Sequence, residues 1–183
     1  DTTQQSRVLL EFVLQFAQCP LVLDADALNL LAATPELLKT AAVPIVLTPH
    51  PGEMARLCKT TVQQVQANRL QIAQSFAIEH RVTVVLKGAG TVIAGADGSV
   101  AVNTTGNAGM AKGGSGDVLA GMIGALLAQG QTPEKAAETA VWIHGRAGDC
   151  CAQRLSQTAM LPTDLLDTLP QIFLEMEKSG DII

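Results

Sequence analysis

The sequence predicts an α/β fold in which a mostly parallel sheet carries helices on both faces. Short, wholly apolar runs alternate along the chain with longer segments of helical periodicity. Strands buried on both faces of a parallel sheet have this continuous apolar character, and repeated strand–helix alternation favours parallel pairing. Polar residues follow several of the apolar runs, at the carboxyl ends where such sheets bind ligands.

The first elements are a helix, a strand and a second, short helix. Apolar side chains recur with helical spacing over residues 8–17, and Cys19-Pro20 ends this helix. The short apolar run at residues 21–23 predicts a buried strand. Asp24 and Asp26 follow that strand directly, and the sequence turns helical again over residues 27–31.

The remaining elements continue the alternation and end in helices. Asp97-Gly98 is a hairpin signal between two short strands, and Gly130 is a typical residue at the end of a helix. No internal repeat, low-complexity tract or linker divides the chain, so we expect one domain over residues 1–183. The expected strands are 43–47, 82–86, 91–94 and 99–102, and the expected helices are 62–79, 117–129, 136–154 and 161–178.

Composition narrows the class of protein and its compartment. The chain has 183 residues, 48% of them hydrophobic and only 16% charged, which describes a compact globular protein. A net charge of −5 without any Lys/Arg cluster argues against nucleic acid as a partner. No signal peptide or membrane-length apolar run is visible, and the four cysteines lack C-x-x-C spacing. We therefore expect buried thiols and a cytoplasmic location.

The densest signal for chemistry is the glycine-rich stretch 103–117, which ends in Gly113-Gly114-Ser115-Gly116-Asp117. Residues without side chains let several backbone N–H groups turn toward one anion, at a helix N-terminus whose dipole favours negative charge. Asp117 either caps this helix, which is worth about 1 kcal/mol, or acts as the general base of a phosphoryl transfer. The stretch is neither a Walker loop nor a dinucleotide fingerprint, because no Lys-Ser/Thr follows its last glycine and no suitable strand closely precedes it.

His50 and Glu53 lie in a turn directly after a predicted strand. Prolines on both sides of His50 stiffen this loop and fix the direction of the imidazole. Glu53 either holds Mg²⁺, through water because magnesium keeps much of its hydration, or lies near a helix start where the dipole favours it. The joint occurrence of both prolines and the histidine favours the functional interpretation.

Two further strand ends carry polar residues. Lys87 ends one buried strand, and it either reaches solvent along its apolar stem or contacts a phosphate. The glycines after it, Gly88 and Gly90, allow a ligand to lie against the backbone. At the other strand end, Asp24 is expected to face the cleft, whereas Asp26 is expected to cap the next helix.

Four of these motifs, taken in order, resemble one family. They are VLDADALN at 22–29, LTPHPGEM at 47–54, LKG at 86–88 and GMAKGGSGDVL at 109–119. Together they resemble the ADP-dependent NAD(P)H-hydrate dehydratases of the ribokinase-like superfamily, which form the carboxyl-terminal domain of bifunctional nicotinamide-nucleotide repair proteins. The similarity runs over essentially the whole chain.

This resemblance implies a ribokinase-like three-layer sandwich and a lyase of metabolite repair. Hydrated NADH or NADPH is dehydrated back to NAD(P)H at the expense of ADP, or of ATP in some relatives, by phosphorylation of the ring hydroxyl and loss of phosphate. His50 and Asp117 would contact the hydrated substrate, Asp117 would be the base, and Glu53 would order the magnesium site. The expected nucleotide contacts are Lys87, Gly88, Ala89, Gly90, Thr91, Gly113, Gly114, Ser115 and Gly116.

The sequence departs from the family's pattern in two places. The family's domain begins with further strands and a glycine-rich loop that supply part of the substrate site, and this chain lacks them. Lys112 stands where a small hydroxyl residue is expected, so the first phosphate contacts of the loop are expected to differ. We therefore expect these 183 residues to bind nucleotide with weak or absent turnover, and to be fused to or completed by an amino-terminal segment.

Two other functions stay open. A ribokinase-like kinase of a small vitamin-precursor alcohol shares the Gly-Asp pattern, although His50 in place of an asparagine and the long glycine-rich loop argue against it. A non-catalytic nucleotide-binding module is the other alternative. We expect no membrane partner, and we expect a homo-oligomer, because the Ala- and Gly-rich helical stretch 121–128 suits close packing between elements or subunits.

Overall fold

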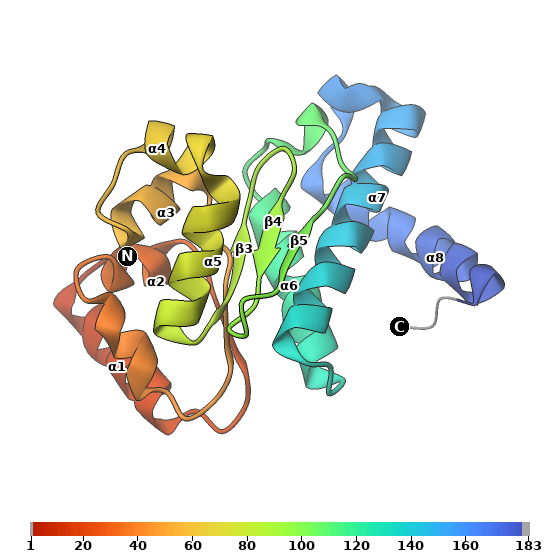
Figure 1. Ribbon diagram of the computed structural model, residues 1–183. Helices are drawn as coiled ribbons and strands as arrows, with labels where there is room; N and C mark the ends of the chain where they lie inside the picture. The colour runs from red at the N-terminus through yellow and green to blue at the C-terminus, as the bar shows by residue number, and fades with distance from the viewer. Residues whose placement is uncertain (1, 181–183) are drawn as a thin grey trace.

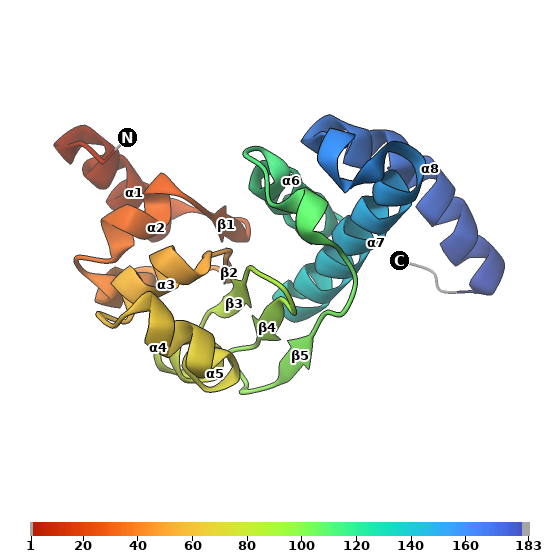
Figure 2. The ribbon, with the colours of Figure 1, turned by 90° about the horizontal axis from the view of Figure 1, so that it is seen from above.

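The computed structural model describes residues 2–180, which form one sheet with helices on both faces (Figure 1 and Figure 2). The first three strands pair in parallel, and the last two pair in antiparallel fashion. The parallel part comes from strands that helices separate, whereas the fourth strand pairs in antiparallel fashion with the third and, across the turn at Asp97-Gly98, with the fifth. In spatial order the strands are β1 (Leu21–Leu23), β2 (Ile45–Leu47), β3 (Thr83–Leu86), β4 (Val92–Ala94) and β5 (Val100–Val102).

The amino-terminal helices cover one face of the sheet (Figure 2). Alternate strand residues, such as Leu47 and Leu86, are buried on this side against side chains such as Leu14 and Met54 of the helices. Strand side chains point alternately to the two faces, so every second residue contributes to this core. The elements on this face are α1 (Gln4–Phe16), α2 (Asp26–Leu31), the 3₁₀ helix η1 (Pro35–Thr40), α3 (Pro51–Leu57), α4 (Val62–Ala67) and α5 (Arg69–His80).

The carboxyl-terminal helices α6 (Ser115–Ala128) and α7 (Pro133–Ala159) cover the other face, and α8 (Pro162–Ser179) packs on α7. Val46 and Val85, which lie between the residues of the first core along their strands, contact Ile123 and Val141 here. A short 3₁₀ helix, η2 (Ala108–Met110), lies in the loop that precedes α6. Within residues 2–180, no helix is long and apolar enough to cross a membrane.

The expected fold class is confirmed, and each expected strand is present and at most two residues shorter than the sequence predicts. The prediction of one helix over 62–79 is wrong, because the chain breaks at Asn68 (φ −134°, ψ 40°) between α4 and α5. The Asn68 side chain donates to Gln64 O at 3.3 Å. An asparagine side chain that competes for helix carbonyls in this way favours a helix end.

The helix predicted at 117–129 begins two residues earlier, at Ser115. Gly114 is its N-cap residue, with a left-handed φ of +97°, and a Cβ there would lie 3.3 Å from Pro162 Cγ. Only glycine adopts this conformation without strain. Asp117 is therefore the third residue of α6 rather than its cap, and its carboxylate is not used to start the helix.

Candidate functional site

The carboxyl ends of β1 and β3 meet the first turn of α6. Lys87 follows β3, and its Nζ lies 2.9 and 3.0 Å from the two carboxylate oxygens of Asp24, which follows β1. A Cβ at Gly116 would lie 3.4 Å from Lys87 Nζ and 3.5 Å from Asp24 Oδ2. The structure thus brings together three of the segments that the sequence singles out. Because the charges of Lys87 and Asp24 largely offset each other, attraction for an anion depends on the surrounding amides.

The loop Lys87–Thr91 leaves its amide groups open. At its start, Lys87 N donates to Pro49 O at 2.8 Å, which ties the loop to the turn after β2. Inside the loop, Thr91 Oγ1 donates to Gly88 O at 3.0 Å. The N–H groups of residues 88–91 donate to no acceptor within residues 2–180. Open amides at the end of a buried strand can hold an anionic group.

Arg69, the first residue of α5, lies against the carbonyl side of this loop. Its Nη2 donates to Leu86 O at 2.9 Å and to Gly90 O at 3.2 Å. Burial lowers the pKa of the Arg69 guanidinium below its ordinary value. No motif in the sequence points to this residue. The one signal for it is a cation at the first position of a helix, where the macrodipole disfavours positive charge.

His50 and Glu53 form a capping box at the start of α3. His50 Nδ1 accepts from Gly52 N at 3.0 Å and from Glu53 N at 3.2 Å, so a neutral imidazole carries its proton on Nε2. Glu53 Oε2 accepts from His50 N at 2.8 Å, and Oε1 lies 3.4 Å from His50 Nε2. The side chain of Glu53 is only 6% exposed, whereas that of His50 is 51% exposed.

This geometry bears on the predicted magnesium site. Both oxygens of Glu53 face His50 and the carboxylate is buried, so Glu53 does not fit as a direct ligand of Mg²⁺ in this arrangement. A contact through water, which magnesium commonly keeps, stays a prediction. Glu36, Glu79 and His80 are a group within residues 2–180 whose ligand atoms lie within 4.8 Å of one another. Glu36 already forms an ion pair, with its Oε2 2.7 Å from Lys39 Nζ. None of these residues belongs to the site predicted from the sequence.

The glycine-rich stretch presents unpaired amides at the start of α6. The N–H groups of Gly113, Gly114, Gly116 and Asp117 donate to no acceptor in the described part of the chain. A Cβ at Gly113 would meet nothing within 4 Å, so neither packing nor backbone conformation demands glycine there. Asp117 is exposed, whereas Ser115 is buried and its N–H donates to Lys112 O at 3.2 Å. Free N–H groups in the first turn of a helix are a ready site for an anion.

The loop before α6 is held by α7. Asp149 Oδ2 accepts from Gly106 N at 2.9 Å, and its Oδ1 accepts from Asn107 Nδ2 at 3.0 Å. Cβ atoms at Gly145 and Gly148 of α7 would collide with this loop, so both glycines allow it to approach closely. Asp149 lies more than forty residues from Gly106 along the chain, and no motif in the sequence points to it.

The side chain of Lys112 points away from the open amides of the loop and toward the end of α7. Its Nζ donates to the carbonyls of Gln157 (3.2 Å), Thr158 (2.8 Å) and Met160 (2.5 Å), at the carboxyl end of α7. A lysine satisfies such terminal carbonyls and interacts favourably with the helix dipole. The expectation that Lys112 changes the phosphate contacts of the loop is therefore not supported by the direction of its side chain.

His144 of α7 lies buried beneath the first turn of α6. Burial lowers the pKa of this imidazole to about 4, and a hydrogen bond with the backbone of Ser115 acts weakly in the opposite direction. Its Nε2 is buried and has no hydrogen-bond partner within residues 2–180. The imidazole is therefore neutral at pH 7 and acts as a packing group under α6.

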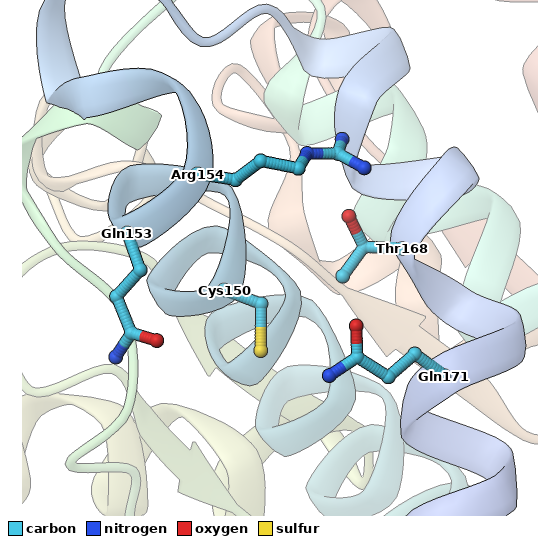
Figure 3. Close-up of a pocket in the computed structure, with 5 residues that line it drawn as sticks. All are labelled: Cys150, Gln153, Arg154, Thr168 and Gln171. Atoms are coloured by element: carbon cyan, nitrogen blue, oxygen red, sulfur yellow. The ribbon is translucent and has the colours of Figure 1, made fainter.

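Two cavities lie away from the residues of the predicted site. A cavity of about 280 Å³ lies between α7 and α8, and Figure 3 shows Cys150, Arg154 and Gln171 around it. A second, of about 470 Å³, lies between the hairpin and α7, with Ile93 and Trp142 in its lining. Neither is lined by a residue of the predicted site.

Comparison with known proteins identifies relatives over nearly the whole chain. A family model described as NAD(P)H-hydrate dehydratase matches residues 1–171. A bifunctional NAD(P)H-hydrate repair enzyme of Moorella thermoacetica is 49% identical over 175 residues, which cover 96% of this chain and 33% of that protein. An ADP-dependent (S)-NAD(P)H-hydrate dehydratase of Bacillus subtilis is 37% identical over 161 residues, covering 88% of this chain and 56% of that one.

Solved structures agree with this result. The crystal structure of an ADP/ATP-dependent NAD(P)H-hydrate dehydratase from Bacillus subtilis, co-crystallised with ATP/Mg²⁺, superposes with a TM-score of 0.84 at 35% identity. The match covers 95% of this chain and 61% of that one. A ribokinase-like superfamily protein from Enterococcus faecalis superposes with a TM-score of 0.80 at 31% identity, over 96% of this chain and 60% of that one. The chain thus spans about three fifths of these structures and a third of the bifunctional relative.

Proposed function

The chain belongs to the NAD(P)H-hydrate dehydratase family, and from that premise we propose that it serves the ADP-dependent dehydration of hydrated NADH or NADPH. The observation that carries the proposal is the convergence of two sets of open amides, those of residues 88–91 and those at the start of α6, on the Lys87–Asp24 pair. Backbone amides at a helix N-terminus suit the phosphates of a nucleotide. The loop Lys87–Thr91 and the residues Gly113, Gly114, Ser115 and Gly116 are proposed to hold ADP, or ATP, as the phosphoryl donor.

In this proposal Asp117 is the base. Its carboxylate is exposed one residue beyond Gly116, next to the proposed phosphate contacts, and accepts no hydrogen bond within residues 2–180. It would take the proton of the ring hydroxyl as that oxygen accepts the terminal phosphoryl group of the donor. The carbon–oxygen bond then breaks, phosphate leaves, and loss of a ring proton restores the double bond. Exposed His50 is proposed to contact the same substrate.

The magnesium ion is proposed to arrive with the nucleotide phosphates, where it would neutralise part of their charge. The chemistry of Glu53 supports an indirect role, because its buried carboxylate orders the His50 turn beside the loop Lys87–Thr91.

Asp117→Asn tests the assignment of the base. The substitution keeps the shape and the backbone amide of residue 117, so the Kd for ADP in isothermal titration is expected to stay within about twofold of the wild type. Turnover, measured as recovery of NADPH absorbance and release of phosphate, is expected to fall by about 10²- to 10⁴-fold. A phosphorylated product in place of free phosphate would instead indicate a small-molecule kinase. Unchanged turnover of Asp117→Asn would contradict its role as the base. Unchanged biological activity with intact ADP binding, in a protein that shows no turnover, would indicate a non-catalytic nucleotide-binding module.

We further propose that the substrate half of the site needs residues beyond these 183. Within residues 2–180, β1 pairs only with β2, so one edge of the sheet carries unpaired backbone groups. Helix α1 exposes Val8, Leu9, Phe12 and Phe16, each more than half accessible. Such a contiguous apolar surface favours cover by further chain. Efficient dehydration by the 183 residues alone, compared with a longer protein carrying the preceding segment, would contradict this proposal.

The last two parts of the proposal are the oligomeric state of the protein and its compartment. We propose a homo-oligomer, because Cβ atoms at Gly121 and Gly124 of α6 would meet nothing within 4 Å and leave a smooth face open for packing. Light scattering of the purified protein measures this directly, and a monomer at all concentrations would contradict it. A cytoplasmic location is supported by the four cysteines, which are all free thiols.

A further inference from the structure

Resting on the proposed function, we infer that Arg69 is a positioning residue that holds the nucleotide-binding loop Lys87–Thr91 by its carbonyl side, so that the amides of residues 88–91 face the ligand. Arg69 is not part of any motif in the sequence and contacts no proposed ligand. It acts on the site through the main chain of the loop.

The hydrogen bonds of the guanidinium carry the first step. Nη2 donates to Leu86 O at 2.9 Å and to Gly90 O at 3.2 Å, and both terminal nitrogens lie 3.4 Å from Lys87 O. One planar fork thus joins carbonyls at both ends of the loop. A peptide whose carbonyl is fixed on one side presents its N–H group on the other. The fork therefore orients the peptides that carry the N–H groups of Gly88 and Thr91, and the bond from Thr91 Oγ1 to Gly88 O orients that of Ala89 between them.

The fit around Gly88 is the second step. Gly88 has a φ of +139°, and a Cβ there would lie 3.0 Å from Arg69 Nη1 and 3.3 Å from Nη2. The loop backbone and the guanidinium are therefore in direct contact, with no room for a side chain between them. An arginine side chain packed this closely fixes the path of the loop as well as its hydrogen bonds.

The charge of Arg69 is the third step. It makes no ion pair with a carboxylate in the described part of the chain, and its remaining partner there is Gln66 Oε1 at 3.0 Å. Its place at the start of α5 opposes the helix dipole, so the helix itself gains nothing from it. Since Asp24 offsets the charge of Lys87, Arg69 supplies the uncompensated positive charge next to the loop, which suits a polyphosphate ligand.

The experiment compares the wild type with Arg69→Gln and Arg69→Lys. In the free protein, ¹⁵N relaxation is expected to give order parameters of about 0.85 for residues 88–91, falling below about 0.6 in Arg69→Gln. Isothermal titration with ADP is expected to show a Kd raised about tenfold or more in Arg69→Gln. Arg69→Lys keeps the charge without the fork, so both readings are expected to lie between those of the other two proteins. Arg146→Gln, which removes one exposed positive charge on α7, is the charge-matched control and is expected to leave both readings unchanged.

The same measurements include results that would overturn the role of Arg69. Unchanged order parameters in a folded Arg69→Gln variant would overturn the positioning role, and a mobile loop with an unchanged Kd for ADP would overturn its link to binding. An Arg69→Lys variant equal to the wild type in both readings would show that charge, rather than the fork, is what matters. If Arg69→Gln does not fold, Gly88→Ala disturbs the same contact from the loop side and is expected to raise the Kd in the same direction. Failure of the wild type to bind ADP would sink the proposed function of this loop, and the order parameters would still decide what Arg69 does.

Discussion

Replacement of His144 by asparagine is expected to reduce the loss of stability that the protein suffers in mild acid. His144 is 9% exposed, its Nε2 has no partner within residues 2–180, and burial lowers its pKa from 6.5 to about 4. An asparagine amide keeps a donor near the backbone of Ser115 but has no proton to gain. The two proteins should therefore differ in how their stability depends on pH.

The magnitude follows from the shift of the pKa. Between pH 6.5 and about 4 the unfolded chain binds a proton at His144 while the folded chain does not, so stability falls as the pH falls. Each unit of pKa corresponds to about 1.36 kcal/mol, so the shift amounts to about 3 kcal/mol once the pH is below both values. Integrated between about pH 7 and about pH 5, His144 costs the wild type about 2 kcal/mol.

Urea unfolding at several pH values between these limits measures the difference. The free energy of unfolding of the wild type is expected to fall by about 2 kcal/mol more than that of His144→Asn over this range. His80→Asn is the matched control, because it removes another buried histidine while leaving His144 in place. Parallel curves for the wild type and His144→Asn would refute the reasoning, since they would show that His144 does not titrate against its burial.

Three further changes test the supports of the site. Asp149→Asn leaves one of the two loop donors without an acceptor, so the free energy of unfolding in urea is expected to fall by about 1–3 kcal/mol; an unchanged midpoint would contradict the role of Asp149 in holding the loop. Lys112→Met uncaps the end of α7 and should lower stability by about 1 kcal/mol in thermal unfolding, whereas a matching loss of ADP affinity would place Lys112 at the ligand after all. Burial raises the pKa of the Cys58 thiol to about 11, so at pH 8 a disulfide reagent should modify exposed Cys19 first and Cys58 slowly. Rapid labelling of Cys58 in a Cys19→Ser variant is the opposite result.

The sequence predicts the sheet well because its strands carry their own signal. Runs such as residues 84–86 are apolar on both faces, which suits the interior of an α/β sheet. The location of Lys87 and Asp24 follows from the same rule, since residues after parallel strands collect at one edge. Their pairing at 2.9 Å could be anticipated as nearness but not as an ion pair.

The helix boundaries were harder to predict because competing local rules apply. Asp117 is a good capping residue by type, yet the helix starts at Ser115, where Gly114 supplies a left-handed turn that packs against Pro162. Asn68 splits a continuous apolar pattern, since its side chain takes a helix carbonyl. In both places a tertiary or side-chain contact outweighs the periodicity of the sequence.

Residues that support the site escaped prediction for another reason. Arg69 and Asp149 each act on a loop far along the chain through fixed directions of their side chains. No spacing in the sequence encodes such a contact. Glu53 shows the converse, because its position after His50 suggested a metal site while its oxygens complete a helix cap. The predicted ligand contacts of the other residues stay predictions.

A binding surface made of peptide N–H groups is not removed by single amino-acid substitutions, because the donors belong to the main chain. Apart from proline, a substitution at exposed Ala89 keeps the N–H donor, so a change of side chain there leaves the recognition group intact. The residues on which binding then depends are the half-buried Arg69, which orients the peptides, and Gly88, which leaves room for the guanidinium. In a saturation mutagenesis screen the loop itself would look permissive at exposed Ala89, while the first residue of a helix on the neighbouring layer would be nearly invariant. A change of side chain is thus tolerated at Ala89, where the ligand meets the main chain, and is costly at Arg69, which the ligand does not contact.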